Sequence, residues 1–309
     1  MNKKYIYLIG SLSVIFAATL WSLDGMLIRP QFYHFPAITI VFLEHFLGSL
    51  ILSPFLFLSF GKIKTINRKV FISLFWVCLF GGLIGTLSIT EAFFAAFRGE
   101  SSLSVIVILQ KLQPIFAIVL AAILLKEKLT KIFYLWAMIA LVSVYFIVFP
   151  DIKLGISGTD FFNIPAIYAI VAAFSFGSST VLGKTLVDDL GFSLSTALRF
   201  LFTSILAFFT LLISGNFFSI SSLELLHWEL LGVIVVTSGA FAMVLYYYGL
   251  KKIKASSATI FELAWPLSAI FFDYIFNGKL LTPIQFIASG VLILCFFMII
   301  NEGKKIESK

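Results

Sequence analysis

The chain has 309 residues, of which 61% are hydrophobic and only 12% are charged. Soluble domains carry roughly 25% charged residues, so this composition excludes a soluble globular protein and indicates an integral membrane protein. The formal net charge is +7, but the Lys and Arg residues lie between apolar segments, so the charge reports membrane topology and contact with anionic lipid, with no nucleic-acid partner.

Ten apolar segments follow one another along the chain, and each is about as long as the roughly 20 residues that a helix needs to cross the hydrocarbon. They fall at 5–28, 36–60, 71–97, 102–125, 131–149, 162–186, 192–214, 227–250, 255–276 and 283–301. The first begins like a signal peptide, but no small-x-small cleavage site ends it, so we expect an uncleaved helix. The connections are too short for a soluble domain. The sequence therefore predicts an all-α integral membrane fold with ten transmembrane helices.

The Lys and Arg residues gather on one side of this ten-helix arrangement. With both termini on that side, it holds most of the 22 cations, and the other side holds Arg29, Arg98, Lys153 and Lys279. Lys and Arg are enriched in cytoplasmic loops. We therefore expect a multi-pass protein of the cell inner (plasma) membrane with both termini in the cytoplasm.

The two halves of the chain resemble each other in sequence. AATLWSLDGMLIR at 17–29 aligns with AAFSFGSSTVLGK at 172–184, and QKLQPIFAI at 110–118 aligns with ELAWPLSAI at 262–270. We expect two five-helix repeats, 1–150 and 151–309. Because five is odd, the second repeat must enter the membrane from the opposite side, and such inverted repeats allow alternating access around a site near the midplane.

These patterns resemble the drug/metabolite transporter superfamily, in particular its ten-helix EamA-type members. The resembling features are A-x-x-W-S at 18–22, ALRF at 197–200, the proline-containing fourth and ninth helices, and LLKEKLT at 124–130. Two departures are Lys279, where the first half has Glu127, and Glu44, where an arginine is common. The resemblance implies a secondary transporter that exports or exchanges small polar or amphipathic metabolites through a central cavity, and the mixed charges favour amino acids.

Charged residues inside the predicted helices are the first candidates for a functional site. A charge at the centre of a membrane helix costs on the order of 3 kcal/mol, so each should face the bundle interior and have a partner. The repeat alignment predicts that Glu44 lies near Lys111 or Gln110 and that Arg199 lies near Glu262. These would be gate or scaffold ion pairs, and substrate contact and proton relay remain open alternatives for each residue.

A wider set of residues is expected to bind substrate or couple transport to a second solute. Its members are Trp21, Asp24, Glu91, Gln110, Lys111, Gln113, Glu262 and Trp265. Glu91 is the expected proton carrier, because it should line the cavity and desolvation disfavours the charged form of a carboxyl group. A neutral Glu91 bonded to a neighbouring helix is the alternative, and the Trp rings could stack on substrate or only pack.

Two prolines at aligned positions, Pro114 and Pro266, should kink the fourth and ninth helices. Each lacks an amide N–H and clashes with the carbonyl four residues earlier. The kinks would fall beside Gln110 and Glu262, where a freed carbonyl can line a cavity.

Sequence motifs of enzymes do not occur in the chain. There is no HExxH, GxSxG or Walker A sequence and no Cys/His cluster, so we expect no catalytic residues, no metal and no cofactor. The expected partners are a small-molecule substrate and the lipid bilayer, with proton coupling as an open alternative, in a monomer or homodimer. A non-transporting membrane scaffold or a channel-like protein is the alternative function.

Overall fold

A computed structural model describes residues 3–64, 66–150 and 162–307 of the chain. Within these ranges, ten helical segments are long and apolar enough to cross a membrane. The segments are Lys3–Phe32, Ala37–Leu58, Arg68–Phe97, Leu103–Leu124, Lys131–Val148, Ile164–Leu190, Phe192–Ile213, Leu225–Leu250, Ala255–Asn277 and Pro283–Lys305. The described part of the chain is helical without strands, so the predicted all-α fold of ten membrane helices is confirmed.

Some of these segments contain more than one helical element. The first consists of α1 (Lys3–Leu23), the π turn η1 (Asp24–Ile28) and the 3-10 turn η2 (Arg29–Phe32), and the second is α2 (Ala37–Leu58), which the short helix α3 (Phe60–Ile63) follows. The third consists of α4 (Arg68–Trp76), the π-helical η3 (Val77–Ile84) and α5 (Gly85–Phe97), the fourth of α6 (Leu103–Gln110) and α7 (Gln113–Leu124), and the fifth is α8 (Lys131–Val148).

The second half repeats this construction. The sixth and seventh segments are α9 (Ile164–Leu190) and α10 (Phe192–Ile213), and the 3-10 turn η5 (Phe217–Ser222) follows them. The eighth consists of α11 (Leu225–Ile234), the π turn η6 (Val235–Gly239) and α12 (Ala240–Leu250), the ninth of α13 (Ala255–Phe261) and α14 (Ala264–Asn277), and the tenth is α15 (Pro283–Glu307). A π-helical stretch thus interrupts the third and the eighth segments, and a break divides the fourth and the ninth.

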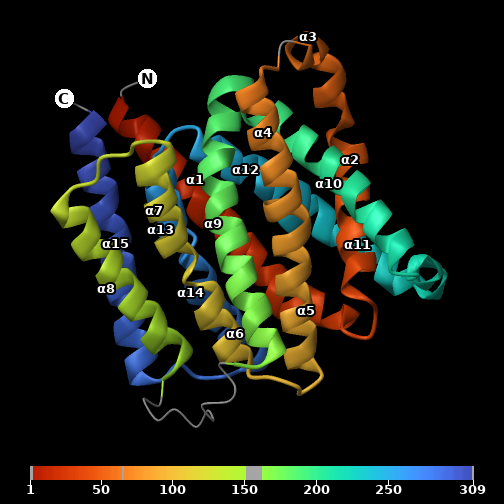
Figure 1. Ribbon diagram of the computed structural model, residues 1–309. Coiled ribbons are helices and arrows are strands. Elements are labelled where there is room, and N and C mark those ends of the chain that lie inside the picture. The colour runs from red at the N-terminus through yellow and green to blue at the C-terminus, as the bar shows by residue number, and fades with distance from the viewer. Residues whose placement is uncertain (1–2, 65, 151–161, 308–309) are drawn as a thin grey trace.

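The two halves run in opposite directions through the bundle. Figure 1 shows the N- and C-termini at the same end, with α8 ending and α9 beginning at the other end. The expected boundary at residues 150 and 151 adjoins residues 151–161, which lie outside the described residues.

Helix packing follows the same repeat. α2 packs on α10 and α8 on α15, which join the second and seventh and the fifth and tenth segments. α1 of the first segment packs on α12 of the eighth, and α9 of the sixth segment packs on α5 of the third. These two contacts are equivalent positions of the repeat. The largest buried apolar cluster includes Val14 of α1, Ala140 of α8, Tyr247 of α12, Phe261 of α13 and Leu292 of α15. The core therefore lies between the halves, so neither half can bury its apolar faces alone.

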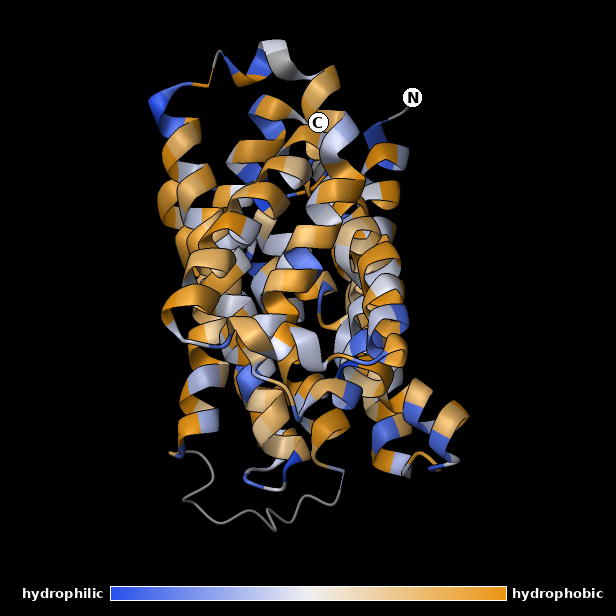
Figure 2. Cartoon of the chain, turned by 90° about the vertical axis from the view of Figure 1, so that its right-hand side faces the viewer, coloured by the Kyte–Doolittle hydropathy of each residue, from blue (hydrophilic) through white to orange (hydrophobic). Residues whose placement is uncertain are grey.

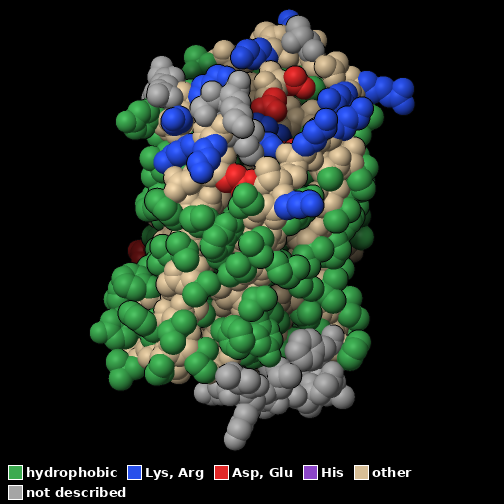
Figure 3. All heavy atoms as spheres, turned by 90° about the vertical axis from the view of Figure 1, so that its left-hand side faces the viewer, with side chains coloured by type: hydrophobic (Ala, Val, Ile, Leu, Met, Phe, Trp, Pro, Cys, Tyr) green, Lys and Arg blue, Asp and Glu red, His purple; other side chains and the backbone are tan. Residues whose placement is uncertain are grey.

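The outer surface has the polarity of a membrane protein. Apolar residues cover the sides of the bundle in Figure 2, and Figure 3 shows Lys and Arg side chains gathered around the end that carries the termini. Large apolar side chains such as Leu58, Phe162 and Ile213 are more than 80% exposed. This apolar surface is suited to contact with lipid tails.

Glycines on the third segment bring it against α9 and α10. A Cβ on Gly81 would meet Ser179 of α9, and a Cβ on Gly82 would meet Thr203 of α10. Only a residue without a side chain fits at this distance, as is common between membrane helices. The glycines of GGLIG therefore set how closely the halves approach around the cavity described next.

Candidate functional site

A central cavity of about 180 Å³, wide enough for water-sized molecules, lies between the two halves. Both repeats contribute side chains from helices that contain a π turn or a break. Its polar and charged lining residues are Asp24, Arg29, Glu44, His45, Thr86, Thr90, Gln110, Lys111, Gln113, Ser179, Thr180, Arg199, Ser238, Tyr246 and Glu262, and its aromatic ones include Trp21, Phe93, Phe176, Phe200 and Trp265. Most of the residues singled out in the sequence therefore meet in one site.

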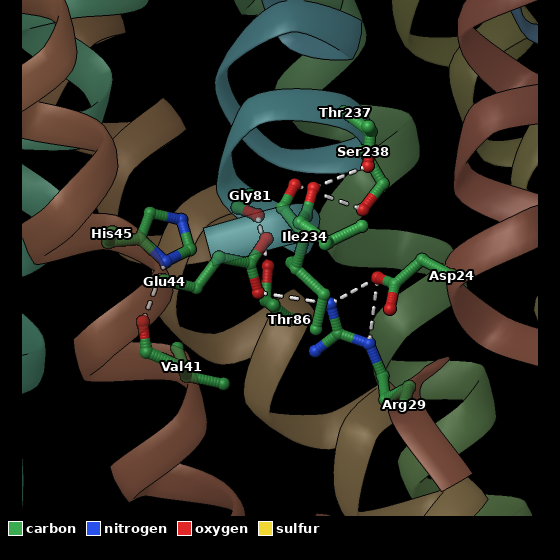
Figure 4. A network of polar contacts seen from close by, with 11 residues as sticks. Asp24, Arg29, Val41, Glu44, His45, Gly81, Thr86, Ile234, Thr237 and Ser238 are labelled. Carbon is green, nitrogen blue, oxygen red and sulfur yellow. Dashed lines mark hydrogen bonds and ion pairs between the residues drawn. The ribbon is translucent and has the colours of Figure 1, made fainter. Parts of the chain in front are cut away.

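A buried cluster of three charges forms one end of the cavity. Arg29 Nε donates to Asp24 Oδ2 at 3.1 Å, and Arg29 Nη2 donates to Glu44 Oε2 at 3.0 Å. All three side chains are at most 10% exposed. Figure 4 shows the Arg29 guanidinium between the two carboxylates. Two acids therefore share one cation in a place with little access to water.

Local helix geometry explains why Arg29 reaches Asp24. In the π turn η1 the Arg29 amide bonds the carbonyl of Asp24, five residues earlier, so residues five apart come onto one side of the helix. The sequence assigned Arg29 to the connections on the side opposite the termini. In the structure, Arg29 belongs to the helical segment Lys3–Phe32 and its buried side chain lines the cavity. The five-residue spacing of acid and base was the signal that could have identified the pair.

Broken helices form the opposite end of the cavity. α6 ends at Gln110 and α7 begins at Gln113, with Pro114 in its first turn, while α13 ends at Phe261 and α14 begins at Ala264, just before Pro266. The two prolines thus accompany full interruptions, which are larger changes than bends. Lys111 and Glu262 occupy the residues that follow α6 and α13, so each break carries a charged side chain into the cavity.

A chain of hydrogen bonds joins the two breaks. Gln110 Nε2 donates to Gln113 Oε1 at 3.0 Å, and Gln113 Nε2 donates to Glu262 Oε2 at 2.7 Å. The hydroxyl of Tyr246 on α12 donates to Glu262 Oε1 at 2.7 Å and lies 2.7 Å from the hydroxyl of Thr180. The fourth, eighth and ninth segments are therefore linked through one carboxylate.

Two expected ion pairs do not form. Glu44 pairs with Arg29 and not with Lys111 or Gln110, and Glu262 bonds Gln113 and Tyr246 and not Arg199. Arg199 instead donates to the Tyr247 hydroxyl at 3.2 Å and to the Gly81 carbonyl at 3.0 Å. The repeat alignment predicted neither partner, because Arg29 lies on the first segment, Gly81 on the third and Tyr247 on the eighth. Pairing depends on helix rotation and depth, which an alignment does not contain.

Aromatic rings line the cavity near the broken helices. Trp21 and Tyr246 lie with ring centroids 5.2 Å apart, and Phe93 stacks on Trp265 at 6.0 Å. The Lys111 ammonium lies 5.0 Å from the Trp265 ring, within the range of a cation–π contact. A flat apolar ligand would find stacking surfaces at this end.

Glu91 lies apart from this site. The residues that line the cavity include Thr86, Thr90 and Phe93 of α5, but not Glu91. Its carboxyl group lies near the backbone of Ala37, at the start of α2, and within reach of the charges of Arg98 and Glu100. The expectation that Glu91 lines the cavity is therefore wrong, because the helix turns it toward α2.

Several lining residues belong to no pattern that marks them in the sequence. His45 Nδ1 donates to the Val41 carbonyl at 2.9 Å, and Tyr246 and Thr180 hold Glu262. Tyr246 belongs to a run of three tyrosines at 246–248, a composition typical of membrane interfaces, so composition alone points away from the cavity. In the described part of the chain no group of His, Cys, Asp or Glu side chains could hold a metal ion, and both cysteines are free.

Comparison with known proteins identifies the family. The EamA-like transporter family matches the chain twice, over residues 8–149 and 163–301. The chain belongs to the EamA-like transporter family. Family membership supports a transport function, a small-molecule substrate and a multi-pass location in a membrane, and it points away from an enzyme.

Relatives of this EamA protein include two curated proteins. It is 36% identical to the "Riboflavin transporter ImpX" of Fusobacterium nucleatum over 298 residues, which cover 95% of this chain and 97% of that protein. It is 25% identical to the "Uncharacterized transporter sll1164" of Synechocystis over 239 residues, which cover 75% of this chain and 66% of that protein. A solved crystal structure matches with a TM-score of 0.71 at 13% identity and covers 97% of both chains, which shows the shared fold.

Proposed function

We propose that this protein is a secondary transporter that carries riboflavin, or a closely similar flavin, across the membrane by alternating access. The observation that carries the proposal is the near full-length similarity, at 36% identity, to a protein named as a riboflavin transporter. The sequence alone favoured amino acids, and the relative and the aromatic lining together favour a flavin.

The charges in the cavity support a solute without net charge. Asp24, Glu44 and Glu262 provide three carboxylates, and Arg29, Lys111 and Arg199 provide three cations. A formally balanced cavity has no excess charge for a charged ligand to neutralise, and burying an unpaired charge is costly. Riboflavin is neutral near pH 7, so it can enter this site without disturbing the balance.

The aromatic lining supports a flat ring as ligand. Trp21, Phe93, Phe176, Tyr246 and Trp265 line the cavity, and an isoalloxazine ring can stack on such side chains. Gln110 and Gln113 add amide groups that both donate and accept hydrogen bonds, which fits the polar edge of the same ring. The cavity is lined by a single chain, so we propose the monomer as the transporting unit.

The distribution of Lys and Arg supports the expected orientation. These residues gather at the end that carries the termini (Figure 3), and such enrichment marks the cytoplasmic side. We propose cytoplasmic termini in an inner membrane. The family resemblance implies export or exchange, and proton coupling is a separate question because Glu91 lies outside the cavity.

Counterflow in proteoliposomes tests the proposed function. Vesicles loaded with unlabelled riboflavin should take up labelled riboflavin saturably, with amino acids unable to compete. Trp265→Leu should raise the half-saturating concentration about threefold to tenfold, because a stacked aromatic pair is worth about 0.5–1.5 kcal/mol. Trp228→Leu is the matched control, since Trp228 is 38% exposed and does not line the cavity.

Each outcome of this test has a clear meaning. Uptake that rises linearly with concentration would favour a channel, and uptake of amino acids without riboflavin would contradict the proposed substrate. Repeating the assay with an imposed pH gradient, with Glu91→Gln beside the unmodified protein, tests proton coupling. Unchanged gradient dependence in Glu91→Gln would remove Glu91 from that role.

A further inference from the structure

The cavity holds polar side-chain atoms that have no hydrogen-bond partner in the described part of the protein. Within the described residues, Ser179 Oγ, Thr90 Oγ1, Arg29 Nη1 and Arg199 Nε are buried and have no hydrogen-bond partner. All four residues line the cavity and are at least 93% buried. Buried polar groups in native proteins nearly always have partners, so several unsatisfied atoms around one cavity indicate that a ligand provides them.

Ser179 and Arg199, which carry two of these atoms, are neighbours on the cavity wall. A Cβ on Gly81 would meet both the Ser179 hydroxyl and the Arg199 guanidinium, so these two groups are neighbours on the face of η3. Asp24 Oδ1 is also without a bond among the described residues, and the Ser238 hydroxyl beside it is bonded to the Ile234 carbonyl at 3.3 Å (Figure 4). His45 of α2 lies within electrostatic reach of Glu44, Arg29 and Arg199, so both arginines are near the same residue.

The unused atoms include both donors and acceptors. The arginine nitrogens only donate, Asp24 Oδ1 accepts as a carboxylate oxygen, and the hydroxyls of Ser179 and Thr90 do both. A phosphate group offers mainly acceptors and would lie against the two carboxylates. A chain of hydroxyl groups offers a donor and an acceptor at each carbon, which matches this mixed set.

We infer that the Arg29–Arg199 end of the cavity is a polyol subsite that binds the hydroxylated side chain of the flavin, while the aromatic end binds its ring. This assignment rests on the proposed function and adds which part of the substrate each end recognises. The two ends adjoin at Gly25, next to Asp24, where a Cβ would meet the Trp265 ring. An amphipathic ligand with a ring at one end and hydroxyls at the other spans both.

Competition between two flavins tests the subsite. Lumiflavin has the same ring as riboflavin but a methyl group in place of the polyhydroxyl chain. Ser179→Ala should raise the half-saturating concentration of riboflavin in counterflow about threefold to tenfold, because it removes one hydrogen bond to the ligand. It should leave the inhibition of counterflow by lumiflavin unchanged. Ser179 has no bond to lose within the described protein, so folding should not suffer. Thr90→Val, which keeps the shape of the side chain, should act in the same direction.

The matched control is Ser175→Ala. Ser175 lies one turn earlier on α9, is also fully buried with an unpartnered hydroxyl among the described residues, and does not line the cavity. Ser175→Ala should change neither the half-saturating concentration of riboflavin nor the inhibition by lumiflavin. Trp265→Leu should weaken the apparent affinity for riboflavin and the inhibition by lumiflavin to the same extent.

The outcomes separate the subsite from the proposed substrate. Equal loss of riboflavin and lumiflavin in Ser179→Ala, or no loss of either, would overturn the polyol subsite while leaving riboflavin transport standing. Tighter binding of riboflavin phosphate than of riboflavin would also overturn it, since that result indicates a phosphate site. Absence of riboflavin counterflow in the unmodified protein would overturn the proposed function itself, and the assignment with it.

Discussion

Arg29 is the side chain on which the charged end of the cavity depends. It is the shared partner of Asp24 and Glu44, and the three come from the end of the first segment and the first half of α2. Buried charges are tolerated when they are paired and become costly when one partner is removed. The cluster therefore fixes how α2 lies against the first segment.

Replacing Arg29 tests this dependence. Arg29→Met should lower the free energy of unfolding by about 3–5 kcal/mol, because two buried carboxylates lose the cation that they share. Adding Asp24→Asn and Glu44→Gln to the same chain should recover much of the loss. Thermal unfolding of the purified protein in detergent measures both effects.

Arg98→Met is the control for this measurement. Arg98 pairs with Glu100 at 2.6 Å on the surface, where the two side chains are 36% and 54% exposed. Exposed pairs contribute little to stability, so this change should have almost no effect. Equal destabilisation by Arg29→Met and Arg98→Met would contradict the proposed importance of the cluster.

Interrupted helices determine the shape of the cavity at the next scale. The breaks before Pro114 and Pro266 direct Lys111 and Glu262 into the cavity, and the π turns η1, η3 and η6 rotate the residues that follow them. A break in a membrane helix leaves backbone groups without helical partners, which is tolerated where they line a cavity. In both halves, the helix breaks and π turns lie in segments that line the cavity.

Pro114→Ala should separate function from stability. An alanine supplies the N–H that Pro114 lacks, so it can bond the Gln110 carbonyl and continue α6 into α7. We expect a slower counterflow rate, because Lys111 and Gln113 would turn away from their present positions, while thermal stability stays the same or rises.

Pro54→Ala is the matched control, since Pro54 lies inside α2 at an exposed position. It should leave counterflow unchanged. If Pro114→Ala transports at the normal rate, or if Pro54→Ala slows transport as much, the break has no special role.

At the scale of the whole molecule, the two ends of the bundle are closed differently. At the end with the termini, Glu127 of the first half caps α13 of the second half: it accepts from the Ala255 amide at 2.8 Å and from both the amide and the hydroxyl of Ser256. Lys279 occupies the aligned place in the second half and makes an exposed pair with Asp273. The halves are therefore tied more firmly at one end than the repeat alone requires.

Glu127→Ala should loosen that end. Loss of a helix cap costs about 0.5–2 kcal/mol, so the cavity should open toward the side of the termini roughly two to thirty times more often. The measurement is the rate at which an impermeant maleimide, added on that side, labels Ser179→Cys in a chain that also carries Cys78→Ala and Cys295→Ala. Lys279→Ala is the matched control and should leave the rate unchanged, whereas equal labelling of all variants would contradict a role for Glu127 in closure.

The ten membrane helices and a distortion at Pro114 and Pro266 could be predicted from the sequence, and most of the residues that it singled out line the cavity. Hydropathy and proline act locally, so their effects can be predicted without knowing the neighbours. Most of the intramembrane charges face the bundle interior because lipid excludes them, and this requirement led from sequence to site.

Which side chain pairs with which could be learned from the tertiary structure alone. A buried charge can be satisfied by any partner within reach, and that reach depends on helix rotation and depth. The π turn η1 places Arg29 beside Asp24 and Glu44. Arg199 bonds Tyr247 and Gly81 instead of Glu262. Helix rotation turns Glu91 away from the cavity. A one-residue widening of a helical turn leaves almost no trace in composition or periodicity, yet it changes the face on which every following side chain lies.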